Sequence, residues 1–244
     1  MTSEALDGAT LLPLFATPLL VYRARGASEL ARDLEQVVLE RMARSPGVSV
    51  SNRGGWHSAN DLETWPEAPV GRLMTEVRRA TREIVRQTVA ECREAHFENW
   101  RIEAWANVNV PGAFNVSHDH VGADNIWSGV FYVEGGGISA EARNKGGRTK
   151  LEDRSMVPKE VIVDQDPFGR EHVVVPEDGL MVLFPASLRH YVEPYCGDET
   201  RITIAFNLKH DGFVIPLYED MQRQNWWWRN FRGLMLVKER LLGK

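Results

Sequence analysis

The feature that most constrains the fold is a change in the spacing of apolar residues at Trp100. Before this residue, apolar side chains recur every three or four positions, which predicts amphipathic helices over residues 28–42, with Ser28 as the cap, and over 69–96. From Trp100 to Val110, apolar and polar side chains alternate, which predicts a strand with one apolar face and one polar, aromatic face. Further strands are predicted over residues 128–133, 160–163, 172–175, 180–184 and 201–208. Helices followed by short strands indicate a mainly β chain of the α+β class, with N-terminal helices packed outside an antiparallel sandwich or barrel.

No internal repeat or flexible linker divides the sequence, so we expect a single domain over residues 1–244. Within it we distinguish an N-terminal segment with helices (11–99), a β core (100–208) and a tryptophan-rich extension (209–244). The stretch 135–153 is rich in Gly, Arg and Lys, which is typical of a basic loop between strands. Such a loop can act as a lid over a site, and the alternative is a solvated connection without a role.

Three consecutive tryptophans, Trp226, Trp227 and Trp228, lie in a predicted C-terminal helix over residues 219–242. Because they surround the helix, one face cannot bury them all. We expect the extension to dock on the core or on a second subunit, which makes a homodimer a candidate assembly. Contact with a membrane surface is the alternative.

Charge and hydropathy exclude several classes of protein. The net charge of −5 provides no basic excess for a phosphate backbone, so we expect no nucleic-acid partner. The apolar run 11–22 is interrupted by Pro13 and Pro18 and is too short to cross a bilayer, which predicts no membrane span and no export signal. The two cysteines, Cys92 and Cys196, have no cysteine neighbour for a thiolate zinc site and suit a reducing compartment, so we expect a cytoplasmic protein.

Two histidines after the alternating strand have the spacing of a metal-binding pair. In an extended segment residues i and i+2 point the same way, so His118 and His120 can converge while Asp119 faces away. His190 follows a predicted strand through a Pro-Ala-Ser turn, and a small barrel can bring it into the same cavity. Three imidazoles with open positions describe a catalytic metal site, although iron, zinc, copper and nickel all suit them, and His-x-His also occurs without metal. His57 is predicted to belong to a structural turn, with a place in the substrate pocket as the alternative.

A series of short motifs runs along residues 11–208. In order, they are Pro13–Pro18, Gly54–Ser58, Asp61–Leu62, Trp105–Asn109, Gly112, His118–His120, Ser128–Val133, Phe184–Pro194 and Arg201–Asn207. This order and spacing resemble the iron(II)- and 2-oxoglutarate-dependent oxygenases, and more closely a bacterial and phage branch of that superfamily. The resemblance implies a double-stranded β-helix, which is a jelly-roll, cupin-like barrel, with Fe(II) as the metal and 2-oxoglutarate and O2 as co-substrates.

The same resemblance assigns the metal ligands. His118 and His190 take the two histidine positions, and His120 stands where the wider superfamily usually has a carboxylate. His-x-His is nevertheless similar to the closer branch. A neutral imidazole in place of a carboxylate raises the formal charge of the site by one unit. Asp119 is the alternative third ligand if a bulge turns it inward.

The resemblance also implies a site for 2-oxoglutarate. Arg201 lies close to where the superfamily places a basic residue, and its planar guanidinium can bind the distal carboxylate of 2-oxoglutarate. Thr203 would face the same cavity two residues further along the strand. Tyr132, Asn107 and Asn109 are candidates for further hydrogen bonds to 2-oxoglutarate. The alternatives are a surface ion pair for the arginine and purely structural partners for the other residues.

Together these implications describe a dioxygenase with His118, His120, His190 and Arg201 as its catalytic residues. The enzyme would hydroxylate an unactivated C–H bond of a small molecule or peptide while 2-oxoglutarate is converted to succinate and CO2. Two other classes of protein stay open. One is a three-histidine metal enzyme that does not use 2-oxoglutarate, and the other is a non-catalytic, cupin-like binding or scaffold protein.

Overall fold

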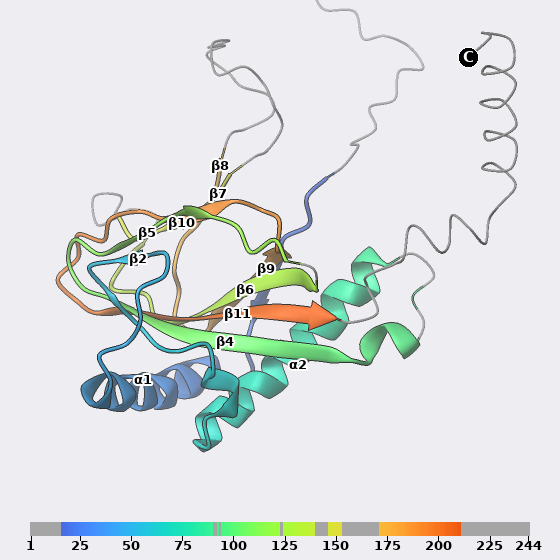
Figure 1. Ribbon diagram of the computed structural model, residues 1–244, viewed down its shortest axis with the longest axis horizontal. Coiled ribbons are helices and arrows are strands. Elements are labelled where there is room, and N and C mark those ends of the chain that lie inside the picture. The colour runs from blue at the N-terminus through green and yellow to red at the C-terminus, as the bar shows by residue number, and fades with distance from the viewer. Residues whose placement is uncertain are drawn as a thin grey trace, which may run out of the picture.

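Two antiparallel sheets face each other in the structure, a computed structural model, and helices cover the outer side of the larger sheet (Figure 1). The structure describes residues 16–89, 92, 94–122, 124–139, 146–152 and 171–210. The larger sheet has the strand order β1 (Leu20–Arg23), β9 (Leu180–Pro185), β6 (Asn125–Glu134), β11 (Arg201–His210), β4 (Trp100–Asn109) and β3 (Trp56–His57). The smaller sheet has the order β2 (Asn52–Arg53), β5 (Phe114–His118), β10 (His190–Val192), β7 (Thr149–Glu152) and β8 (Glu171–Val174). The helices are α1 (Ala27–Arg44), α2 (Ala68–Thr88) and the short 3-10 helices η1 (Leu62–Thr64) and η2 (Glu94–Phe97).

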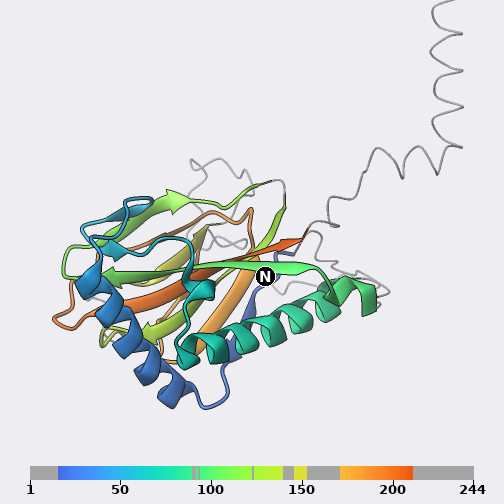
Figure 2. The same cartoon turned by 60° about the horizontal axis from the view of Figure 1, so that its bottom comes forward.

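The helices α1 and α2 lie on the same face of the larger sheet (Figure 2). In α1, Leu30, Leu34 and Val38 are buried at intervals of four residues, so that one stripe of the helix faces the protein. Each fully buried side chain of this kind contributes about 1.5–3 kcal/mol to stability relative to an exposed one. The helices therefore stabilise the larger sheet from outside and leave its other face to the space between the sheets.

Both helix boundaries differ from the sequence prediction. The N-cap of α1 is Gly26, at a φ of 60°, so Ser28 lies inside the first turn and does not cap the helix. The second helix ends at Thr88, and a separate turn, η2, replaces its predicted last residues. The chain has to change direction to enter β4, and Asn99 adopts a left-handed φ of 60° just before that strand. Apolar periodicity does not reveal such a turn.

The strand β4 confirms the predicted alternation, and its two faces contact different parts of the protein. Ala104, Ala106 and Val108 are buried in the core that the helices share with the larger sheet. On the opposite face, Trp105 and Asn107 line a cavity between the two sheets. The polar, aromatic face is thus turned to the interior of the sandwich, where it can serve a site.

Other strands were partly predictable. The strands β6, β8, β9 and β11 overlap the ranges predicted over residues 128–133, 172–175, 180–184 and 201–208, whereas the range 160–163 lies outside the described residues. The short strands β5, β7 and β10 are absent from the sequence prediction. The prediction of a loop over residues 135–153 is wrong where β7 lies, because Thr149 and Leu151 are buried and pair within the smaller sheet.

Several predictions fall outside the described residues. They are the C-terminal helix over residues 219–242 with its subunit contact and the central part of the predicted lid, residues 140–145. Within the described ranges, no helix combines the length and the apolar content needed to cross a bilayer.

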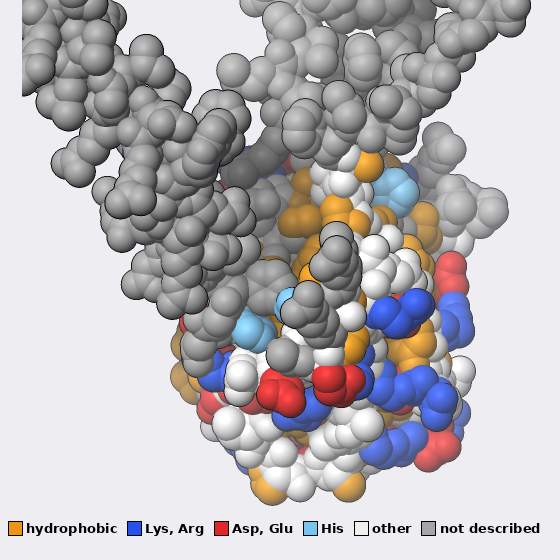
Figure 3. All heavy atoms as spheres, turned by 90° about the vertical axis from the view of Figure 1, so that its right-hand side faces the viewer, with side chains coloured by type: hydrophobic (Ala, Val, Ile, Leu, Met, Phe, Trp, Pro, Cys, Tyr) orange, Lys and Arg blue, Asp and Glu red, His pale blue; other side chains and the backbone are white. Residues whose placement is uncertain are grey.

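Acidic and basic side chains are intermixed on the face drawn in Figure 3.

Candidate metal centre

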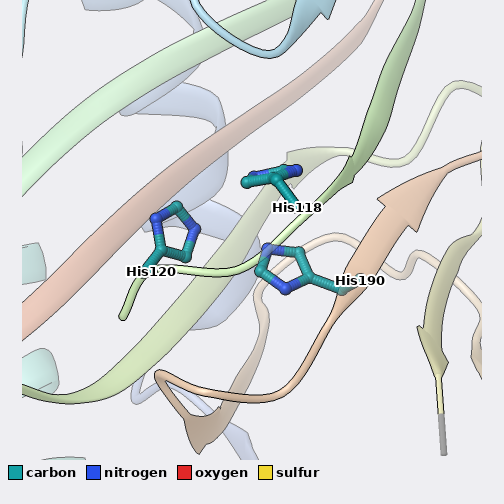
Figure 4. A group of neighbouring side chains, drawn as sticks. All are labelled: His118, His120 and His190. Atoms are coloured by element: carbon teal, nitrogen blue, oxygen red, sulfur yellow. The ribbon is translucent and has the colours of Figure 1, made fainter. Parts of the chain in front are cut away.

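Three histidines meet between the two sheets. His118 is the last residue of β5, His120 follows two residues later, and His190 is the first residue of β10. The antiparallel pairing of β5 with β10 places His190 opposite His118. Figure 4 shows the three imidazoles grouped around one point, and one ring nitrogen from each lies within 4.8 Å of the others. Such a cluster could hold a single metal ion.

Backbone carbonyls orient two of the three rings. Nδ1 of His118 lies 2.6 Å from the carbonyl oxygen of Val116, and Nδ1 of His190 lies 2.9 Å from that of Leu188. A carbonyl oxygen only accepts hydrogen bonds, so Nδ1 carries the proton in both neutral rings. The lone pair is then on Nε2, which is the ring nitrogen left for a metal.

Burial keeps the imidazoles uncharged. The pKa of His118 is lowered by burial. Burial and the neighbouring His190 and His118 lower the pKa of His120 to about 3, and burial together with His118 lowers that of His190 to about 4. Near neutral pH all three rings are therefore neutral, which is the form that binds a metal ion.

Asp119 does not join this cluster. Its Oδ1 accepts a hydrogen bond of 3.3 Å from the backbone N–H of Val121, as in a local turn, and the set of three converging ligand atoms is made by histidines alone. Asp119 is thus not one of the three residues whose ligand atoms converge.

A buried arginine borders the same cavity. Arg201, the first residue of β11, is 1% exposed, and its pKa is lowered by burial. Its Nη1 is 3.5 Å from Oδ1 of Asn109, the ring of Tyr132 lies 5.7 Å from its guanidinium carbon, and its Nε has no hydrogen-bond partner. Among the described residues, no carboxylate forms an ion pair with it. A buried cation without an acidic partner is costly, so this position suits an anionic ligand.

The other predicted polar residues surround the arginine. Asn107 and Thr203 pair across β4 and β11 and both line the cavity. Oδ1 of Asn107 is buried without a hydrogen-bond partner in the described part of the chain. Tyr132 is fully buried and donates a hydrogen bond of 2.8 Å to Oγ1 of Thr149, a cavity residue, so its hydroxyl already has a partner.

Two aromatic residues near the centre, Trp105 and His57, were not predicted to contact the histidine cluster. Trp105 lines the cavity, and its indole lies 5.6 Å, between centroids, from the ring of His120. His57 stacks on Trp105, with centroids 5.8 Å apart and planes 10° apart. His57 is 2% exposed and belongs to β3, so the prediction of a structural turn is wrong for this residue. The sequence did contain a signal for the role of Trp105, because the alternation of β4 places it on the same strand face as Asn107, a predicted site residue.

The segment that carries this site is similar to a known protein family. Residues 103–207 match the family model described as "Putative 2OG-Fe(II) oxygenase". This range contains the three histidines, Arg201 and the polar residues around it. No curated protein matches the chain by sequence.

Solved structures resemble the whole sandwich. A prolyl-4-hydroxylase from Pseudomonas putida has a TM-score of 0.56 at 18% identity, with 81% of this chain and 95% of that chain covered. HygX from Streptomyces hygroscopicus, solved with nickel and 2-oxoglutarate, has a TM-score of 0.53 at 12% identity, with 80% and 84% covered. A prolyl hydroxylase from Trichoplax adhaerens, solved with a fragment of hypoxia inducible factor, has a TM-score of 0.51 at 14% identity, with 79% and 84% covered.

These likenesses establish the fold as a double-stranded β-helix, which the sequence resemblance implied. The matching family is that of the 2OG-Fe(II) oxygenases, which use iron(II), 2-oxoglutarate and O2. The three neutral imidazoles and the buried guanidinium fit a metal ion and a dicarboxylate. Residues 103–207 thus resemble the 2OG-Fe(II) oxygenase family in sequence, and the sandwich has the fold of the prolyl-4-hydroxylase from Pseudomonas putida.

Proposed function

We propose that the chain is a dioxygenase that hydroxylates an unactivated C–H bond of a small molecule or a peptide, with release of succinate and CO2. The observation that carries the proposal is the placement of three neutral imidazoles beside a buried guanidinium that has no acidic partner among the described residues. The imidazoles can bind a metal ion, and the guanidinium can bind a dicarboxylate. The sandwich thus offers adjoining places for both.

In this proposal, His118, His120 and His190 hold iron(II). Nε2 is the ligand atom of His118 and His190, because Nδ1 of each faces a backbone carbonyl. Three protein ligands leave positions open for other molecules, as catalytic metal sites require. Bound iron(II) supplies the activation of O2 and the oxidative decarboxylation of 2-oxoglutarate. The third imidazole makes the site one charge unit more positive than a site with a carboxylate.

Arg201 binds the distal carboxylate of 2-oxoglutarate in this proposal. Asn109 lies against Nη1 and helps to orient the guanidinium, while the hydroxyl of Thr203 is available in the same cavity. A charge-assisted contact with a carboxylate would balance the cost of burying the arginine. Asn107, with its free Oδ1, offers a further polar contact on the cavity wall.

The substrate class rests on shape and on likeness. The cavity lies between the sheets and is lined by residues of both, among them Ser51, Asn115, Val192 and Ala205. The prolyl hydroxylase from Trichoplax adhaerens holds a peptide fragment, which supports a peptide as one candidate substrate for this fold. A small molecule remains the other candidate.

A three-histidine enzyme without 2-oxoglutarate is the second candidate function, favoured by the imidazole of His120 in place of a carboxylate. This alternative gives Arg201 no ligand to bind. A non-catalytic binding protein, in turn, would bind a ligand without turnover.

The experiment is a screen for uncoupled turnover. Purified protein with Fe(II), 2-oxoglutarate and O2 is incubated with pooled metabolites or peptides, and succinate is measured. We expect succinate above the level of the His190→Ala variant, and more of it in pools that contain the substrate. Succinate at the level of that variant in every pool, with iron bound, would refute the proposal.

A further inference from the structure

The three imidazoles are not held in the same way. His118 and His190 are oriented through Nδ1 by carbonyl oxygens of Val116 and Leu188. Among the described residues, no hydrogen bond reaches the ring of His120. A metal-binding histidine normally has such a second contact, which fixes the orientation of its ring. The structure must therefore orient His120 by another means.

In the described part of the chain, hydrogen bonds reach only the backbone of His120. Its N–H donates to the carbonyl oxygen of Ala186 at 2.9 Å, and its carbonyl oxygen accepts a hydrogen bond of 2.9 Å from Nδ2 of Asn125. The residue lies beyond the last residue of β5, so strand pairing does not determine the direction of its side chain. Packing against a neighbouring side chain is the remaining constraint.

Besides the other two candidate ligands, His118 and His190, whose ring centroids lie 5.0 and 5.1 Å from that of His120, this neighbour is Trp105. Its indole lies against the ring of His120, with centroids 5.6 Å apart and planes tilted by 53°. Trp105 is 7% exposed, and the ring of His57 stacks almost parallel to its indole. Centroid separations of this size are typical of favourable aromatic contacts. Two ring contacts, of His57 with Trp105 and of Trp105 with His120, thus connect β3, β4 and the segment after β5.

The pairing of β3 with β4 determines the contact between His57 and Trp105. His57 pairs with Asn107 across β3 and β4, so Trp105 is its diagonal neighbour on the same face of the sheet. Trp105 is buried and packs against the side chain of His57, which leaves it little freedom to move. Trp105 is therefore a rigid surface for the third imidazole.

We propose that Trp105, supported by His57, is the positioning residue that holds the ring of His120 in place for metal binding. This inference rests on the proposed function, since it requires a metal on the three histidines. It replaces the usual hydrogen bond to the distal ring nitrogen with an aromatic contact. Removal of the indole should then weaken metal binding although no ligand atom is lost.

The test uses Co(II) as the probe metal, added to the full-length protein without 2-oxoglutarate. Its visible absorption reports the geometry of the ligands, and a titration gives the affinity. We expect Trp105→Leu to lower the Co(II) affinity by about tenfold or more and to change the spectrum, because supporting residues of metal ligands contribute on this scale. Trp105→Phe keeps a ring in place and should retain most of the affinity.

A matched control separates positioning from a loss of stability. Phe131 on β6 is fully buried in the core on the helix side, away from the cavity. Phe131→Leu should lower the free energy of unfolding of the apoprotein and leave the Co(II) affinity within about twofold of the wild type. An equal loss of affinity in Phe131→Leu and Trp105→Leu would overturn the inference.

A double-mutant cycle shows whether the indole acts through His120. In a His120→Asp background the short carboxylate does not provide a ring for the indole, so adding Trp105→Leu should change the Co(II) affinity by no more than about twofold. Wild-type affinity and spectrum in the folded Trp105→Leu protein would overturn the inference and leave the metal site intact. Failure of the wild type itself to bind Co(II) would overturn the proposed metal site as well, so the two failures are distinguishable.

Discussion

His118 and His190 lie opposite each other across the pair of strands β5 and β10, with their ring centroids 4.5 Å apart. Because side chains alternate between the faces of a sheet, a register slip of one residue would turn one of the two imidazoles away from the cavity. The register of two short strands thus decides whether a metal site exists. His120 joins from the chain immediately after β5.

The ligand set gives the first prediction. His118→Ala, His120→Ala and His190→Ala should each lower the Fe(II) affinity by about a hundredfold or more, since loss of a ligand costs at least as much as loss of a supporting residue. Anaerobic equilibrium dialysis measures this affinity. Asp119→Ala serves as the control and should bind iron as the wild type does. The opposite pattern, in which only Asp119→Ala loses iron while His120→Ala retains it, would show that the wrong third ligand was chosen.

Arg201 gives a prediction in which stability and function change in opposite directions. Arg201→Met removes a buried cation that has no acidic partner among the described residues, so the free energy of unfolding of the apoprotein should rise by about 2 kcal/mol. The variant should also stop responding to 2-oxoglutarate. Urea denaturation measures both effects.

Added metal and 2-oxoglutarate at about 100 times the dissociation constant should stabilise the wild type by about 2.7 kcal/mol over the metal-bound form, and should not stabilise Arg201→Met. The metal affinity of the variant is the control and should not change. Equal stabilisation of both proteins by 2-oxoglutarate would remove Arg201 from the co-substrate site.

The contact between β1 and α2 gives a prediction about pH. Burial alone would raise the pKa of Glu76, but hydrogen bonds from Tyr22 and Arg79 outweigh it and lower the pKa below the ordinary value of 4.5. The unfolded chain then binds a proton at a higher pH than the folded protein does, so the stability that Glu76 contributes is present above pH 4.5 and is lost as the pH falls below it.

Glu76→Gln should therefore destabilise the protein by about 2 kcal/mol at pH 7, as expected for hydrogen bonds to a charged group. The difference from the wild type should shrink as the pH falls below about 4.5. Urea denaturation across this pH range provides the measurement. A difference that stays constant with pH would mean that the charge of Glu76 is not what stabilises this contact.

The sequence predicted the structure best where an alternation of apolar and polar residues continued over many positions. The ten residues of β4 alternate without interruption, and this alternation alone predicts one face for a core and the other for a site. The convergence of His118 and His120 could be predicted from their i, i+2 spacing, although His120 lies just after the end of β5. The family-level motifs, taken in order, supported the jelly roll.

Short strands escaped prediction for a physical reason. The strand β10 has three residues, and β5 and β7 have five and four, too few for a period to be recognised. Their pairing depends on contacts between residues distant in the chain, such as His190 with Leu151. The stack of His57 on Trp105 was equally hidden, because it follows from the pairing of β3 with β4 and not from any local motif.

The most direct test of the central claim is the anaerobic absorption spectrum of the protein with Fe(II) and 2-oxoglutarate. We predict the weak visible charge-transfer band of an iron–2-oxoglutarate chelate in the wild type, no band in His190→Ala, and in Arg201→Ala a band that needs about a hundredfold more 2-oxoglutarate. Full iron loading of the wild type without this band at any concentration of 2-oxoglutarate would contradict the account.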